Sequence, residues 1–223
     1  MIITISGPGG SGKSTVAKKL TEKLNAERIY VGGIRRKYAK QKGITLNELN
    51  ELALTNPESD VEIDKTAANK ARDLAKDKIV IVEGRTQFHF LPESLKFYVK
   101  CDLGESTKRI WEDIHQNPFR NEKKPNSIEE LKQLIIEREK SDLARYKKYY
   151  NLNHKDESQY DHVIDTTNIT ADQATEKIIK IIKENITLNR ILQLNHKLGL
   201  DWLLNLFFCA YKAPLNLHLL EHL

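Results

Sequence analysis

A glycine-rich segment near the start of the chain has the residue types and spacing of a phosphate-binding loop. Glycines let successive backbone amides point into one concavity, which holds a phosphate anion. A following lysine is placed to reach β- and γ-phosphates, and a serine hydroxyl to hold Mg²⁺. The pattern G-x-x-x-x-G-K-[ST] predicts binding of a nucleoside triphosphate by Gly7, Pro8, Gly9, Gly10, Ser11, Gly12, Lys13, Ser14 and the adjoining Thr15.

A second group of candidate residues follows the apolar run 79–82 and consists of Glu83, Gly84 and Arg85. Residues at the carboxyl end of a parallel strand face the ligand crevice of an open sheet. Glu83 is therefore placed to hold Mg²⁺ through water, and Arg85 to form paired hydrogen bonds with an acceptor phosphate. The alternative is an ordinary ion pair at the end of a strand.

A pair of arginines, Arg35 and Arg36, stands just after Gly32 and Gly33, where a helix is expected to begin. Positive charge is unfavourable at the positive end of a helix. A bound phosphate would remove this mismatch, so Arg36 or its neighbour is a candidate phosphate ligand. The alternative is a solvated basic helix start.

A third set of basic residues is expected on a long helix and on the segment before it. Arg138, Asp142 and Arg145 fall at i, i+4 and i+7, which places them on one helix face. Arg109 and Arg120 lie nearer the polar segment 117–127. Phosphoryl transfer needs positioned cations, and an arginine-bearing flap that excludes water would supply them. Weak arginine–aspartate pairs on a surface helix are the alternative.

The elements that must position these residues alternate between strands and helices. Apolar or β-branched runs predict short strands at 2–5, 28–31, 79–82, 97–99 and 162–164. Helical patterns lie between and after them, with helices expected at about 105–116, 128–150 and 171–185. Such alternation predicts βαβ units, that is, a five-stranded parallel sheet with helices on both faces.

Composition limits the remaining classes of protein. The 223 residues carry a net charge of +5 with both signs interspersed, which fits nucleic acid and anionic small molecules equally. The phosphate-binding motifs account for the basic excess, so we expect no nucleic-acid partner. Two cysteines exclude a disulfide framework. The chain shows no signal-peptide pattern, and its leucine-rich tail, 188–223, has no uncharged run near the ~20 residues that span a membrane. We expect a cytoplasmic protein without a transmembrane segment.

These segments together resemble the cytidylate kinase family of nucleoside monophosphate kinases, in its short archaeal form. The resemblance lies in residues 2–15, 32–43, 80–85, 136–146 and 160–166, and covers about 1–187. It implies a P-loop NTPase fold, with three α/β/α layers and a five-stranded parallel sheet. It also implies an acceptor-binding helical insert at about 34–76 and a lid at about 109–146. The implied reaction uses ATP and Mg²⁺ to convert CMP or dCMP to the diphosphate.

The resemblance also implies roles for single residues. Lys13, Arg138 and Arg145 would act in catalysis, while Arg109, Arg120 and Asp142 would belong to the lid. The acceptor would contact Arg36, Gly84, Arg85, Phe88 and His89. The chain departs from the family at Gly33, where relatives often have an acidic residue, and over 86–92 after the Glu-Gly-Arg segment.

Two alternatives to this function stay open. One is a kinase of the same fold for another nucleotide or a small metabolite. The other is a non-catalytic nucleotide-binding protein. We expect a monomer, with the tail 188–223 as a possible oligomer contact.

Overall fold

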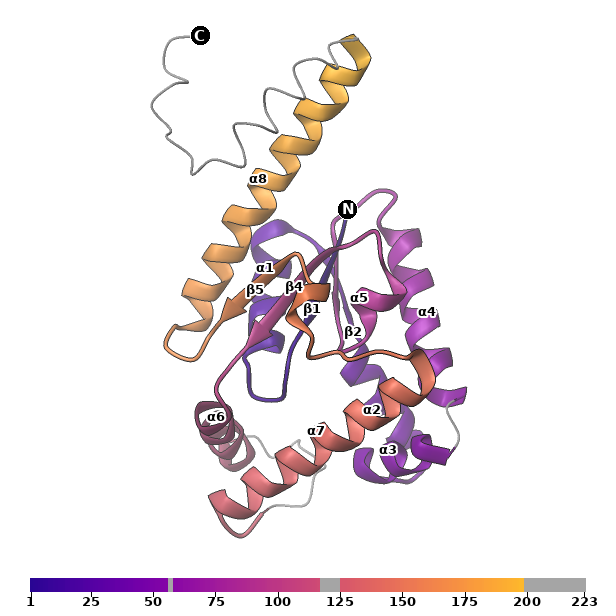
Figure 1. The fold of residues 1–223 in the computed structure, drawn as a ribbon, viewed down its shortest axis with the longest axis vertical. Coiled ribbons are helices and arrows are strands. Elements are labelled where there is room, and N and C mark those ends of the chain that lie inside the picture. The colour runs from indigo at the N-terminus through magenta and orange to yellow at the C-terminus, as the bar shows by residue number, and fades with distance from the viewer. Residues whose placement is uncertain (56–57, 117–124, 199–223) are drawn as a thin grey trace. The chain divides into compact units, whose positions relative to one another are not determined.

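The computed structural model describes residues 1–55, 58–116 and 125–198 (Figure 1). Its chain divides into two compact units, Met1–Glu176 and Lys177–Leu223. The first unit contains the whole sheet, whose strands are β1 (Ile2–Ser6), β2 (Glu27–Tyr30), β3 (Val80–Glu83), β4 (Leu95–Lys100) and β5 (His162–Asp165). The strand order is β2-β3-β1-β4-β5, and every neighbouring pair is parallel. The predicted five-stranded parallel sheet is therefore confirmed.

Helices connect the strands. They are α1 (Lys13–Leu24), α2 (Val31–Gln41), α3 (Leu46–Thr55), α4 (Glu58–Leu74), α5 (Gln87–Phe90), α6 (Leu103–Gln116), α7 (Ile128–Tyr150), the short 3-10 turn η1 (Glu157–Gln159) and α8 (Ala171–Leu198). Side chains cap several of them. The Thr45 hydroxyl accepts the Glu48 amide hydrogen at 3.2 Å, the Ser127 hydroxyl that of Glu130 at 3.1 Å and the Thr170 hydroxyl that of Gln173 at 3.2 Å. These bonds satisfy amides that a helix start leaves unpaired.

Helices cover both faces of the sheet. The side chains of a strand point alternately to either face, so each strand contributes apolar residues to both. Ile2, Val80 and Val82 belong to one buried cluster with the α4 residues Ala67 and Ala71. Their strand neighbours point to the opposite face, where α1 packs along β1, β2 and β3. Figure 1 shows α1 and α4 on opposite sides of the sheet, which gives the expected three-layer arrangement.

Strand register brings the candidate residues to one edge of the sheet. Ile5 of β1 and Tyr30 of β2 both lie opposite Glu83, the last residue of β3. The segments that follow these three strands therefore begin side by side at their carboxyl ends. A hydrogen bond of 2.7 Å from the Ser6 hydroxyl to the Gly84 carbonyl joins two of them. This edge holds both the phosphate loop and the Glu83–Arg85 segment.

The last helix, α8, runs to Leu198, so the predicted end near residue 185 is wrong. Residues 186–198 contain neither glycine nor proline, and nothing in them interrupts the helix before Gly199. Of the predicted tail 188–223, the part after residue 198 lies outside the described residues. Within the described part of the chain, no helix is long and apolar enough to cross a membrane.

Candidate active site

The phosphate loop connects β1 to α1 through backbone conformations that need glycine. Gly10 has φ of 73°, and a Cβ there would lie 2.4 Å from the Ser106 carbonyl oxygen. Gly12, with φ of 79°, precedes the first residue of α1. The amide-rich N-terminus of α1 thus opens beside the loop, which suits an anion.

Lys13 extends from the loop into a cavity of about 430 Å³. Its ammonium group donates a hydrogen bond of 2.8 Å to the Pro8 carbonyl. Burial, followed by the positive charge of Arg85, lowers the pKa of Lys13 to about 7. Arg36 and Arg138 lower it further. A negatively charged phosphate would relieve this repulsion, so the cluster is suited to binding one.

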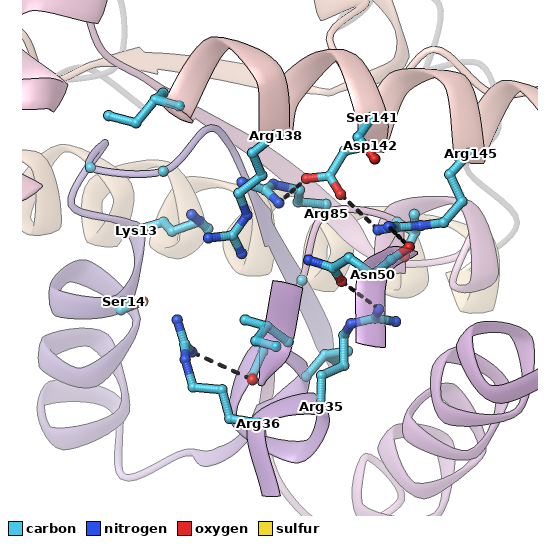
Figure 2. A pocket seen from close by; sticks show the side chains of 18 of the residues that line it. Lys13, Ser14, Arg35, Arg36, Asn50, Arg85, Arg138, Ser141, Asp142 and Arg145 are labelled. Atoms are coloured by element: carbon cyan, nitrogen blue, oxygen red, sulfur yellow. Dashed lines mark hydrogen bonds and ion pairs between the residues drawn. The ribbon is translucent and has the colours of Figure 1, made fainter. Parts of the chain in front are cut away.

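Cations from four distant segments line this cavity. Figure 2 shows Lys13, Arg85 and Arg138 with their charged ends directed toward one another, and Arg36 on a separate segment below them. Arg85 follows β3, Arg138 belongs to α7 and Arg36 to α2. The Arg36 guanidinium donates to the Tyr30 hydroxyl at 2.5 Å. The predicted phosphate ligands of the donor and acceptor sides thus share one cavity.

A buried ionic network holds the arginines in place. Asp142 of α7 pairs with both Arg85 and, at 2.7 Å, Arg145. Arg145 is only 1% exposed, and its Nε lies 2.9 Å from a carboxylate oxygen of Asp60. Asp60 pairs in turn with Arg35. Burial alone would raise the pKa of Asp142, but the adjacent guanidinium groups hold it below its usual value. The network joins α7 to α4, α2 and the end of β3.

Glu83 lines the cavity and is 1% exposed. One carboxylate oxygen accepts a hydrogen bond from the Ser14 hydroxyl, and the other accepts one from the Arg28 guanidinium. Carboxylate and hydroxyl oxygens are ligands that Mg²⁺ accepts, together with water and substrate phosphates. The donor set at Ser14 and Glu83 therefore fits magnesium.

Two residues predicted on the acceptor side do not line the cavity. Phe88 is buried against Tyr160, with ring centroids 4.4 Å apart, and against Tyr98. His89 is exposed and contacts the rings of Phe90 and Tyr150. These predictions are wrong because the short helix α5 turns the segment away from the cavity directly after Thr86.

Gly84 does line the cavity, and its surroundings are tight. A Cβ at this position would lie 2.7 Å from Cγ of Gln87 and 3.3 Å from the Val31 side chain. A larger residue at this position would require the side chains of Gln87 and Val31 to move.

Arg109, predicted to belong to the lid, lies on α6. Its guanidinium donates to Glu105 at 2.9 Å and to the Thr166 carbonyl at 2.7 Å. It lines a second cavity of about 230 Å³, formed by the far side of the phosphate loop and the segment 166–171. Arg120, the other predicted lid residue, lies outside the described residues.

Several residues of the site were not predicted from the sequence: Arg28, Asn50, Asp60 and Asp64. Asp60 and Asp64 stand four residues apart, a spacing that places two carboxylates on one face of a helix. That spacing could have indicated Asp60 and Asp64 from the sequence. No comparable sequence pattern indicates Arg28 or Asn50.

Fold and site together define a P-loop nucleotide-binding protein of the small-kinase type. A solved structure of an uncharacterized protein from Eubacterium ventriosum has the same fold, with a TM-score of 0.59 and 22% identity over 82% of this chain and 98% of the other. The chain belongs to the cytidylate kinase-like family, whose model matches residues 2–168. The cytidylate kinase of Methanothrix thermoacetophila is 40% identical over 74% of this chain and 88% of its own length.

A further similarity extends past the family segment. The S-adenosylmethionine-dependent nucleotide dehydratase of Lacinutrix mariniflava is 31% identical over 93% of this chain, which spans 41% of that relative. A match over 93% of the chain must continue beyond residue 187. Part of the C-terminal segment is therefore common to both proteins.

Proposed function

We propose that this protein transfers the γ-phosphoryl group of ATP to the phosphate of CMP or dCMP. The observation that carries this proposal is the shared cavity in which Lys13, Arg85 and Arg138 meet. Lys13 comes from the phosphate loop, Arg85 from the acceptor-side segment after β3, and Arg138 from α7. Such an arrangement suits two phosphate groups that must approach each other.

The reaction would proceed by direct displacement. A phosphate oxygen of the acceptor forms a bond to the γ-phosphorus, the bond from that phosphorus to the β–γ bridging oxygen breaks, and ADP leaves. No protein base is required, because the acceptor phosphate is already ionised. Lys13, Arg138 and Arg85 would stabilise the charge on the transferred group and hold the two phosphates in line.

Magnesium would be held by the Ser14 hydroxyl and, through water, by Glu83. When bound, it would neutralise phosphate charge during transfer. The protein contributes the orientation of both ligands, since Ser14 and Glu83 are already hydrogen-bonded to each other.

The donor base would enter the second cavity. This cavity adjoins the phosphate loop through Ser11, Gly12 and Thr15, and Arg109 forms one of its walls. A guanidinium plane is a suitable surface for stacking a nucleobase. Arg109 therefore has a part in ATP binding in this proposal.

The test is a substrate panel. CMP, dCMP, UMP, AMP and GMP are each offered with MgATP, and formation of ADP and of the new diphosphate is measured separately. We expect CMP or dCMP to give the highest kcat/KM and EDTA to abolish turnover. Absence of any diphosphate with the folded wild-type protein would contradict the proposal. We also propose that the enzyme works in the cytoplasm and is a monomer. Sedimentation analysis would check the oligomeric state.

A further inference from the structure

Asp64 is a carboxylate in a cavity otherwise suited to anions. It belongs to α4, is 4% exposed and lines the large cavity together with Thr86. A negative charge at this place repels phosphate, so phosphate binding does not account for it. The hydrogen bonds that the structure shows to Asp64 come from uncharged donors, while the charges of Arg35 and Asp60 act on it from nearby.

Three side chains donate to the Asp64 carboxylate. The Thr86 hydroxyl donates to Oδ2 at 2.8 Å and the Tyr150 hydroxyl to the same oxygen at 3.3 Å. The Gln87 amide donates to Oδ1 at 2.9 Å. Gln87 and Tyr150 do not line the cavity and hold Asp64 from behind. The carboxylate is thus fixed in one orientation.

Asp64 and Thr86 have only hydrogen-bond acceptors left to offer a ligand. A carboxylate offers about four lone-pair sites, so Asp64 Oδ1 can accept a further hydrogen bond. The Thr86 hydrogen is directed to Asp64, which leaves only lone pairs on its oxygen for a ligand. Burial raises the pKa of Asp64 to about 6, so near pH 7 its carboxyl group is mainly ionised. In that state the two side chains present acceptors, and no donor, to whatever lies beside them in the cavity.

We infer that Asp64 and Thr86 select an acceptor nucleotide whose base carries an exocyclic amino group, and so favour cytosine over uracil. The inference rests on the proposed function. The amino group would donate one hydrogen to Asp64 and the other to Thr86. Uracil has a carbonyl oxygen at that position, which would face two acceptors with no hydrogen between them. A site built to hydrogen-bond a group of its substrate strongly rejects analogues that lack this group.

The experiment compares kcat/KM for CMP and UMP in the wild type and three variants. We expect the wild type to prefer CMP by on the order of 100-fold or more. Thr86→Val, which keeps the shape of the side chain, should reduce the ratio at least about tenfold. Asp64→Asn, which introduces a donor, should lower it further and raise the activity with UMP. The KM for ATP should not change.

Tyr150→Phe is the matched control. It removes a donor to the same carboxylate without changing the lining of the cavity, and it should keep the CMP-to-UMP ratio. A loss of the ratio in Tyr150→Phe as large as in Thr86→Val would assign the effect to general loosening of Asp64, and would overturn the inference.

The outcomes separate the inference from the proposed function. A wild type that phosphorylates no nucleotide overturns both. If the wild type uses UMP as well as CMP, or if folded Thr86→Val keeps the wild-type ratio, the inference fails while the proposed function stands. If Asp64→Asn does not fold, Thr86→Val alone decides. A variant with too little turnover is compared by calorimetric binding of CMP and UMP.

Discussion

The guanidinium of Arg85 donates a hydrogen bond to the carboxylate of Asp142, which lies 57 residues further along the chain. Arg85 lies two residues after the end of β3, and Asp142 belongs to α7, which also carries Arg138 and Arg145. The contact fixes a cation of the acceptor side against the helix that supplies the other cations. The phosphate-binding groups are thus held in place before substrate arrives, which reduces the entropic cost of ordering them.

Asp142→Asn should destabilise the fold. Asp142 is 1% exposed and pairs with two guanidinium groups, and removal of one partner leaves buried charge uncompensated. We expect the free energy of unfolding in urea to fall by about 3 kcal/mol. Glu139→Gln is the control on the same helix, because Glu139 pairs with the more exposed Lys155 and should change stability by no more than about 1 kcal/mol. Equal losses in the two variants would contradict the assignment.

Lys13→Met should reduce kcat by about a thousandfold while the protein stays folded, because the methionine lacks the charge that stabilises the transferred phosphoryl group. Its circular dichroism spectrum should match the wild type. Lys19→Met changes a lysine of the same helix whose partner is the exposed Asp172, and should keep full activity. Near-normal turnover in folded Lys13→Met would remove the proposed mechanism.

Arg36→Ala should raise the KM for CMP by about 10- to 100-fold and leave the KM for ATP unchanged, because a charged hydrogen bond to the acceptor phosphate is lost. Steady-state kinetics with each substrate varied in turn measures both constants. Arg72→Ala is the control, since Arg72 pairs with Glu93 at the surface. An equal rise in both KM values would show that Arg36 does not act on the acceptor side.

Arg109→Ala should give the opposite pattern. Arg109 lines the second cavity, so its loss should raise the KM for ATP about tenfold and leave the KM for CMP unchanged. Binding of the ATP analogue AMPPNP, measured by calorimetry, should weaken in parallel. A higher KM for CMP with an unchanged KM for ATP would contradict the role of Arg109 in ATP binding.

His154 should make the fold less stable in mild acid. Its imidazole is 4% exposed, and burial, followed by the charge of Arg85, lowers its pKa to about 4. The unfolded chain, with a pKa near 6.5, takes up a proton that the native state does not. The contribution of His154 to stability is therefore present above pH 6.5, and falls by roughly 1.4 kcal/mol per pH unit as the pH drops toward 4.

His154→Phe tests this expectation, because phenylalanine keeps a ring against Tyr146, whose centroid lies 5.0 Å away, but does not titrate. The difference in unfolding free energy between wild type and variant should shift in favour of the variant between pH 7 and pH 5. A difference that is independent of pH would contradict the lowered pKa.

The amino-acid sequence alone determined the parts of this protein that depend on local spacing. The phosphate loop from Gly7 to Ser14, the five strands and the helix starts after Ser127 and Thr170 follow from patterns within a few residues. The face shared by Arg138, Asp142 and Arg145 follows from helix geometry. The resemblance to cytidylate kinases rested on the same segments, and family membership is confirmed.

Only the tertiary structure decided which side chains meet. Asp64 reaches Thr86 and Tyr150, and Arg28 reaches Glu83, across elements far apart in the chain. Phe88 and Arg109 were assigned from their position in the sequence, yet α5 turns Phe88 into the core and α6 directs Arg109 to the second cavity. Backbone conformation follows from local sequence, whereas the partner of a side chain depends on how distant elements pack against one another.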